Sequence, residues 1–199
     1  MEVELLGWPA DGPTLRLDYE RFAYAGKFVM SSTGKAVARE DGELVGAVAF
    51  NADRTDETVC WLRYVTVRQD RKGEGIGPRL CEYVRDRALE RGYEELRIAV
   101  NNPYAYEALY RAGFGFTGET TGIAELVLAF PPEDTVDERY RNGLKRFRDR
   151  DITDAERSFV SERLERGEPV ESGDRAGRTD RTGVADRADQ GDRTDGSRN

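Results

Sequence analysis

Histidine is absent from this chain of 199 residues. Its absence excludes a Ser-His-Asp triad, a Cys-His nucleophile pair and the zinc sites that depend on histidine. Cysteine is scarce too: Cys60 and Cys81 lie far apart in apolar stretches, without the spacing of metal ligands. We interpret both as buried free thiols in a reducing compartment. The acidic clusters also lack ligand spacing, so no metal site is predicted.

Lysine is nearly as scarce, because only four of the 31 basic residues are Lys and the rest are Arg. The 39 acidic residues outnumber them and give a formal net charge of −8. An acid-rich, lysine-poor chain stays soluble at high salt, so we expect a halophilic host. No basic patch stands out, which argues against a nucleic-acid partner.

Long apolar runs are also missing. No stretch approaches the about 20 apolar residues that a membrane-spanning helix requires. The first residues, MEVELLGWPADG, lack the basic start of a signal peptide. We therefore expect a soluble, cytoplasmic protein with no membrane partner.

The apolar patterns that are present predict one mixed α/β domain over residues 1–131. Strands are predicted at 2–8, 35–40, 43–50, 59–67, 95–100 and 124–130, and helices at 17–28, 78–91 and 101–112. The dipeptide Asp41-Gly42 tolerates positive φ and predicts a tight hairpin turn. One parallel crossover is expected in the middle of the domain.

Residues 132–166 are predicted to form an appended helical hairpin. Val136, Tyr140, Leu144 and Phe147 fall on one helical face, and the segment 153–156 fits a capping box. The apolar face either docks on the core or mediates a homodimer. In residues 167–199 Asp-Arg pairs recur among Gly, Thr and Ala with few larger apolar residues, which predicts a disordered tail.

Glycine is concentrated in RKGEGIGPRL, residues 71–80, between a predicted strand and a predicted helix. The unpaired N–H groups and the dipole of a helix N-terminus bind anions, and glycine allows the main chain to approach closely. A P-loop needs Gly-Lys-Ser/Thr, but Pro78 follows Gly77, and the spacing does not match the Gly-x-Gly-x-x-Gly of dinucleotide sites. A pyrophosphate-binding loop and a plain glycine-rich turn are the readings left.

Two motifs resemble those of the GCN5-related N-acetyltransferase (GNAT) family. Residues 72–77 resemble its acyl-coenzyme A loop, Gln/Arg-x-x-Gly-x-Gly/Ala, with Lys72 where the family prefers Gln or Arg. The stretch NPYAYEALYRAGF, residues 102–114, resembles its next motif, Asn-x-x-Ala-x-x-Leu-Tyr-x-x-x-Gly-Phe, in register and without a gap. The resemblance spans about residues 35–130.

The resemblance implies a GNAT-like mixed central sheet that is splayed open at an acyl-CoA site and flanked by helices. It also implies an acetyl-CoA-dependent N-acyltransferase that moves an acetyl group to a primary amine by direct attack in a ternary complex. The cofactor-binding residues would be Val65, Thr66 and Val67 for the pantetheine and thioester, Asn102 for the pantetheine arm, and Lys72, Gly73, Glu74, Gly75, Ile76 and Gly77 for the pyrophosphate.

The match departs from the family at one catalytic position. Leu109 stands where the family places the Tyr that commonly protonates the departing thiolate. Tyr110 is one residue later, about 100° further round a helix. Tyr110, Tyr106 or water would serve as the acid, unless both phenols only pack in the core.

The general base and the acceptor are not specified by any motif. Glu57 and Glu125 are the nearest carboxylates in the sequence, and an ordered water is the alternative. Strand alternation would turn only one of Arg63 and Tyr64 toward the acceptor. The acceptor is expected to be a small-molecule or peptide amine. A non-catalytic acyl-CoA-binding or regulatory module is the alternative function.

Overall fold

The computed structural model of the chain describes residues 1–10, 12–122, 125–133, 137–167 and 169. The strands are β1 (Glu2–Gly7), β2 (Gly34–Glu40), β3 (Glu43–Ala52), β4 (Val59–Val67), β5 (Glu95–Val100), β6 (Gly115–Thr121) and β7 (Glu125–Phe130). The helices are α1 (Ile76–Glu90), α2 (Pro103–Arg111), α3 (Asp137–Arg148) and α4 (Asp154–Arg166), with short 3₁₀ turns at Ala25–Lys27 and Gln69–Arg71.

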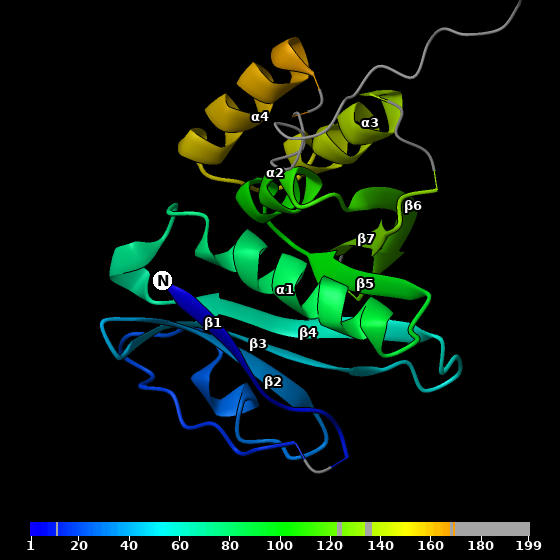
Figure 1. The fold of residues 1–199 in the computed structure, drawn as a ribbon. Coiled ribbons are helices and arrows are strands. Elements are labelled where there is room, and N and C mark those ends of the chain that lie inside the picture. Colours follow the sequence, from blue (N-terminus) through cyan, green and yellow to red (C-terminus); the bar gives the residue numbers. More distant parts are fainter. Residues whose placement is uncertain (11, 123–124, 134–136, 168, 170–199) are drawn as a thin grey trace, which may run out of the picture.

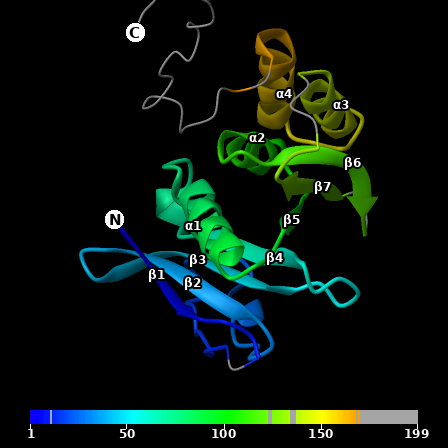
Figure 2. The same cartoon turned by 45° about the vertical axis from the view of Figure 1, so that its right-hand side comes forward.

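The strands form one open sheet in the order β1-β2-β3-β4-β5-β7-β6. The β4–β5 pair is its parallel pair, and the neighbouring pairs are antiparallel. Helix α1 packs on one face of β3 and β4, while α2, α3 and α4 gather at the β5-β7-β6 end (Figures 1 and 2). The predicted α/β class with a mixed central sheet is confirmed. Every described helix is too short or too polar to cross a bilayer.

The predicted helix over 17–28 is wrong. The segment is a series of turns that ends in the 3₁₀ turn Ala25–Lys27, and Tyr24 has a positive φ of 58° that a continuous helix does not allow. Phe22, Ala25 and Phe28 are buried at three-residue spacing, a pattern that successive turns fit as well as a helix does. Strand β6 was not predicted, because GFTGETT lacks apolar alternation and lies at the sheet edge.

A buried lysine fixes the segment that leads into β2. Lys35 is 0% exposed, and its ammonium group donates to the carbonyl oxygens of Met30 and Thr33 at 2.6 and 2.8 Å. A third hydrogen bond goes to the Thr33 hydroxyl, so all three donors of the ammonium group are satisfied. This arrangement ties the loop before β2 to the sheet, on the side where Phe28 packs against Val37 and Ala47.

The helical hairpin docks on the core of the domain. Tyr140, Leu144, Phe147 and Val160 belong to the main apolar cluster, and the Tyr106 hydroxyl donates to the Tyr140 carbonyl oxygen at 3.1 Å. The capping box of α4 is present as predicted. Val136 and the predicted tail, apart from residues 167 and 169, lie outside the described residues. A homodimer stays a prediction.

Gly143 allows this docking, since a Cβ at that position would lie 2.0 Å from the Tyr106 hydroxyl oxygen. Gly143→Ala is expected to lower the free energy of unfolding by about 1–3 kcal/mol, as overpacked core substitutions do. Helix propensity alone predicts the opposite sign, a gain of about 1 kcal/mol. Urea unfolding measures the difference, and Asn142→Ala, exposed on the same helix, is the matched control. A Gly143→Ala protein as stable as the control would contradict the packing.

Candidate functional site

A β-bulge in β4 opens the middle of the sheet. Residues Val59 to Leu62 pair with β5, and the parallel pairing ends at Leu62. At that point the register between β3 and β4 slips by one, because Ala49 pairs with Tyr64 and Phe50 with Leu62. Arg63 is therefore the extra residue, and a bulge bends its strand. Beyond Leu62 the strands β4 and β5 diverge.

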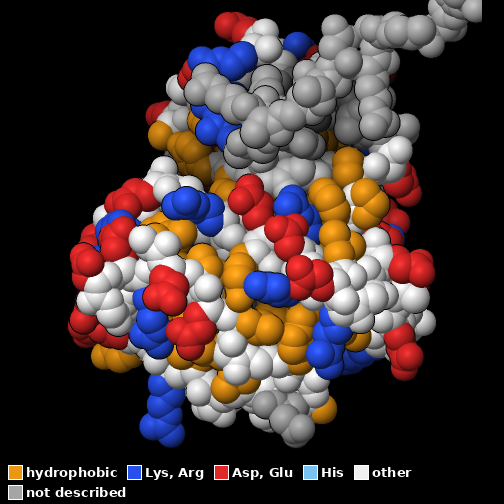
Figure 3. Space-filling view, in the orientation of Figure 1, with side chains coloured by type: hydrophobic (Ala, Val, Ile, Leu, Met, Phe, Trp, Pro, Cys, Tyr) orange, Lys and Arg blue, Asp and Glu red, His pale blue; other side chains and the backbone are white. Residues whose placement is uncertain are grey.

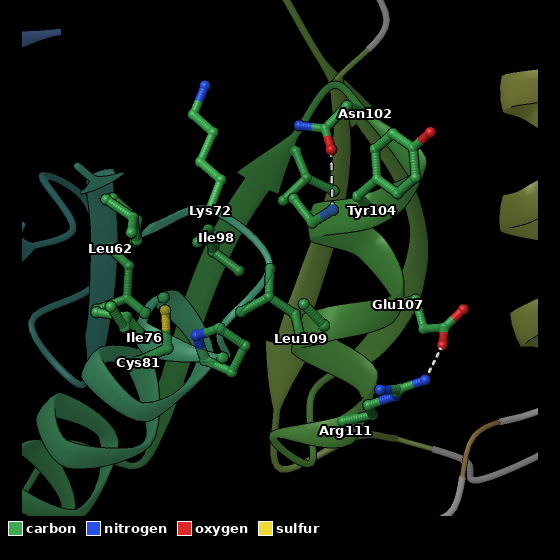
Figure 4. Close-up of a pocket in the computed structure, with 18 of the residues that line it drawn as sticks. Leu62, Lys72, Ile76, Cys81, Ile98, Asn102, Tyr104, Glu107, Leu109 and Arg111 are labelled. Carbon is green, nitrogen blue, oxygen red and sulfur yellow. Dashed lines mark hydrogen bonds and ion pairs between the residues drawn. The ribbon is translucent and has the colours of Figure 1, made fainter. Parts of the chain in front are cut away.

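The opening between the strands leads into a cleft of about 990 Å³. Its walls come from β4, β5, the loop before α1, the first turns of α1, and one face of α2 (Figure 4). Two residues of α4 and Tyr24 of the N-terminal segment also line it. Both Arg63 and Tyr64 line the cleft, so the expectation from strand alternation is corrected: the bulge interrupts the alternation.

The glycine loop turns its main chain toward this cleft. Residues 72–77 all line it, and their N–H groups donate no hydrogen bond within the described part of the chain. Gly73 and Gly75 have φ of 87° and 77°, which favours glycine at both. Helix α1 begins at Ile76, two residues before the predicted start, so Pro78 falls within its first turn. The geometry is that of an anion site at a helix N-terminus.

The charges at the loop favour an anion. The Glu74 carboxylate is held by Arg71 at 2.8 Å, and Arg71 also binds Glu40. Lys72 and Arg79 are exposed and form no ion pair among the described residues. Across the α1 face as a whole, acidic and basic side chains are interspersed (Figure 3). The loop thus has two cations, Lys72 and Arg79, beside a Glu74 carboxylate that shares the Arg71 guanidinium with Glu40.

The predicted cofactor residues of β4 divide between the two faces of the strand. Val65 and Val67 line the cleft, whereas Thr66 is 3% exposed and does not. The Thr66 hydroxyl has no hydrogen-bond partner among the described residues. A ligand in the cleft would therefore meet the main chain and the two valines, and would not meet the Thr66 hydroxyl.

Asn102 lines the cleft and also begins α2. Its Oδ1 accepts a hydrogen bond from the Ala105 N–H at 2.9 Å, which is an N-cap (Figure 4). Pro103 follows as the first residue of the helix. The side-chain oxygen is thus occupied by the cap. The amide nitrogen donates to Asn101 Oδ1 at 3.4 Å, and its second N–H is the donor that a ligand could meet.

The two predicted acids are buried away from the cleft. Tyr106 and Tyr110 are 0% and 6% exposed, and neither lines the cleft. The Tyr110 hydroxyl accepts from the Phe116 N–H at 2.8 Å, and its ring packs on Tyr140. Leu109, the neighbour of Tyr110, does line the cleft (Figure 4). This geometry gives neither phenol a path to a ligand in the cleft.

Of the two carboxylates considered as the general base, one lines the cleft and the other does not. Glu125, at the start of β7, lines the cleft, while Glu57, in the loop before β4, does not. Glu107 also lines the cleft but is 3% exposed and is paired with Arg111 and Arg163. Glu125 is therefore the carboxylate of the two candidates that a bound amine could reach.

The cysteine that lines the cleft is unsuited to carry an acyl group. Cys81 is 1% exposed, and burial raises the pKa of its thiol to about 12. Since the thiolate is the nucleophile, this side chain is inert near neutral pH. No group of three or more metal-ligating side chains occurs in the part of the chain that the structure describes.

Several cleft residues were not found from the sequence. Tyr24, Phe159 and Arg163 come from segments that carry no motif, Tyr104 is at an unspecified position of the 102–114 motif, and Arg79 lies just beyond the glycine loop. For Tyr24 the useful signal is its strained φ of 58°, which a sequence does not display. Phe159 and Arg163 of α4 reach the cleft because the hairpin docks on the core, which a local sequence pattern does not show.

Comparison with known proteins gives a family match. Residues 3–116 match the profile of the Acetyltransferase (GNAT) family. Among curated proteins none matches the chain. Several solved structures do match the chain.

Nourseothricin acetyltransferase is 25% identical, with a TM-score of 0.44 over 49% of this chain and 64% of that one. The PaiA N-acetyltransferase of Thermoplasma acidophilum, in complex with coenzyme A, is 18% identical, with a TM-score of 0.42 over 48% and 58%. The yncA structure from Salmonella typhimurium, with its cofactor acetyl-CoA, is 17% identical, with a TM-score of 0.45 over 49% and 64%. The chain thus covers less than two thirds of each of these proteins.

Tyr110→Phe separates a structural role from an acid role. The loss of the hydroxyl leaves the Phe116 N–H without its acceptor, so we expect the free energy of unfolding to fall by about 1–3 kcal/mol. The rate of thiol release from acetyl-CoA per folded molecule should not change. Denaturant unfolding and a thiol assay measure the two quantities, with Tyr19→Phe, at an exposed tyrosine, as control. A large loss of rate at unchanged stability would restore Tyr110 as the acid.

Proposed function

Because the chain belongs to the GNAT acetyltransferase family, we propose that it is an acetyl-CoA-dependent N-acyltransferase acting on a primary amine. The single observation that carries the proposal is that residues 72–77 line a cleft in a parted sheet while their N–H groups donate no hydrogen bond within the described part of the chain. Bound acetyl-CoA supplies the acetyl group as a thioester that an amine can attack. A primary amine and the donor bind together, and transfer is direct.

The donor fits the residues of the cleft. The main-chain N–H groups of residues 72–77, with Lys72 and Arg79 beside them, would hold the pyrophosphate. The diverging edge of β4 near Val65 and Val67 would bind the amide groups of pantetheine with its main chain. The Asn102 amide nitrogen would contact the same arm.

Direct transfer is supported because the cysteine that lines the cleft is a poor nucleophile. An acyl-enzyme route needs a reactive side chain, and burial keeps the Cys81 thiol protonated with a pKa of about 12. The amine itself is then the attacking group. It must lose a proton, and Glu125 is the cleft carboxylate that we propose to accept it or to hold the cationic amine.

The leaving group does not require a protein acid. A thiol has an unperturbed pKa of about 8.5, so a thiolate departs readily and takes its proton from water. Leu109 at the family's tyrosine position is therefore compatible with turnover. The acceptor would lie against Tyr24, Arg63 and Tyr64, on the side of the N-terminal segment.

A non-catalytic acyl-CoA-binding or regulatory module is the second candidate function. It is favoured by the position of Leu109 in the cleft and by the burial of Tyr106 and Tyr110. Thiol release over a panel of small-molecule and peptide amines separates the two functions. Binding of acetyl-CoA without turnover on any amine would support the module.

Acetyl-CoA should stabilise the protein through the glycine loop. At about 100 times its dissociation constant, the ligand adds about 2.7 kcal/mol to the free energy of unfolding. Gly75→Ala should abolish most of this gain, since a Cβ at a φ of 77° costs about 1–2 kcal/mol and tilts the loop amides. Thermal unfolding with and without acetyl-CoA, at high salt, measures both effects.

Gly42→Ala is the matched control for the loop. Gly42 has a φ of 81° and open space around its Cα, as Gly75 does, but it lies in the β2–β3 turn outside the cleft. Gly42→Ala should lower the melting temperature about as much as Gly75→Ala does. Acetyl-CoA should still stabilise Gly42→Ala as much as it stabilises the unsubstituted protein. If acetyl-CoA did not raise the melting temperature of the protein without substitutions, the proposed function would be contradicted.

Glu125→Gln should slow transfer to the amine by about 10²-fold or more if the carboxylate removes the proton. Its affinity for acetyl-CoA should not change, because the cofactor loop is untouched. Glu57→Gln, at a carboxylate outside the cleft, is the control and should retain the full rate. Steady-state rates against amine concentration and pH measure the effect. Equal rates for the two variants would remove Glu125 from the reaction and leave an ordered water as the base.

A further inference from the structure

Helix α4 reaches the cofactor cleft although it lies beyond the segment that matches the family. The match ends at residue 116, and α4 covers Asp154–Arg166. Phe159 and Arg163 of this helix line the same cleft as the glycine loop. In Figure 1 α4 lies above α2, on the side that α2 turns to the hairpin. The appended hairpin is therefore part of the wall of the cleft.

An aromatic pair stands where this wall meets α2. The rings of Tyr104 and Phe159 lie 4.6 Å apart between centroids, with their planes inclined by 51°. Tyr104 is 44% exposed, so part of its ring surface is open to solvent. Figure 4 shows Tyr104 beside Asn102, across the cleft from Lys72. The open ring is thus at the mouth that leads to the loop.

Phe159 packs against the side chain of Arg163. The Arg163 guanidinium carbon lies 4.5 Å from the centroid of the Phe159 ring. Arg163 is in turn paired with the buried Glu107 of α2, which also binds Arg111. Charge-assisted hydrogen bonds to a buried carboxylate orient the guanidinium, and the Phe159 ring packs against it. The pair is a preformed surface with one ring exposed.

We propose that the exposed ring of Tyr104, supported by Phe159, stacks on the adenine of the acyl-CoA nucleotide. This inference rests on the proposed function and extends the donor site onto the hairpin. When the pyrophosphate lies on residues 72–77 and pantetheine lies between the strands, the adenosine emerges at the mouth of the cleft. A flat ring exposed there provides the surface that purines bind. Phe159 acts as a positioning residue.

The test compares two probes that differ by the adenosine together with its 3′-phosphate and one phosphate of the pyrophosphate. Dissociation constants are measured by calorimetry for CoA and for 4′-phosphopantetheine, which keeps the pantetheine and one phosphate. Tyr104→Ala should weaken CoA by roughly 5-fold to 100-fold, the usual range for loss of a base stacked on an aromatic ring. The affinity for 4′-phosphopantetheine should not change. Tyr104→Phe should keep the CoA affinity, since stacking does not need the hydroxyl.

Two variants on α4 test the contribution of the hairpin. Phe159→Ala should weaken CoA selectively, in the same direction as Tyr104→Ala. Leu164→Ala removes a half-buried apolar side chain from the same helix outside the cleft, and it should bind both probes as the unchanged protein does. Because Tyr104 is exposed, its variants keep the test sound even if Phe159→Ala loosens the helix.

Four outcomes would overturn the inference. Tyr104→Ala with unchanged CoA affinity would show that the ring does not touch the nucleotide. An equal loss for both probes would place Tyr104 against pantetheine instead. Equal affinity of the unchanged protein for CoA and 4′-phosphopantetheine would show that the adenosine is unbound, and would leave the proposed function intact. Failure of the unchanged protein to bind CoA at all would overturn the proposed function as well.

Discussion

The divergence of β4 from β5 is the constraint on which the rest of the site depends. The parallel pairing ends at Leu62, and the bulge at Arg63 bends β4 away at that residue. The cleft exists because the two strands part, and the glycine loop faces it because the loop directly continues β4 into α1. Separated strands leave main-chain groups without partners, and a ligand that carries amides, as pantetheine does, can satisfy them. The bulge and the proposed donor site therefore belong together.

Helix α2 connects the cleft to the hairpin through its two faces. Asn102 and Leu109 lie on the cleft side, whereas Tyr106 and Tyr110 are buried against α3. A helix advances about 100° per residue, so a one-residue difference in position turns Leu109 to the cleft and Tyr110 into the core. Glu107 belongs to both sides, because it lines the cleft and is paired with Arg163 of α4. Docking of the hairpin and the shape of the cleft are thus coupled.

Most of the fold follows from interactions between residues that are close in the chain. Strand alternation, the Asp41-Gly42 turn and the capping box predicted the sheet strands and helices around them, and the structure contains these elements. The polar edge strand β6 was missed, since its pairing with β7 rather than its own sequence makes it a strand. The helix predicted over 17–28 was wrong because apolar spacing does not reveal the backbone angle at Tyr24.

The sequence by itself determined the glycine loop and the Asn102 motif, because main-chain geometry at glycines and helix caps depends on the nearest residues. Only the tertiary structure decided which side chains line the cleft. Glu125 rather than Glu57 faces the cleft because of how β7 lies beside β5. Arg163 reaches Glu107 across 56 residues of chain. Such contacts depend on packing between distant segments, and no local pattern encodes the direction in which a side chain then points.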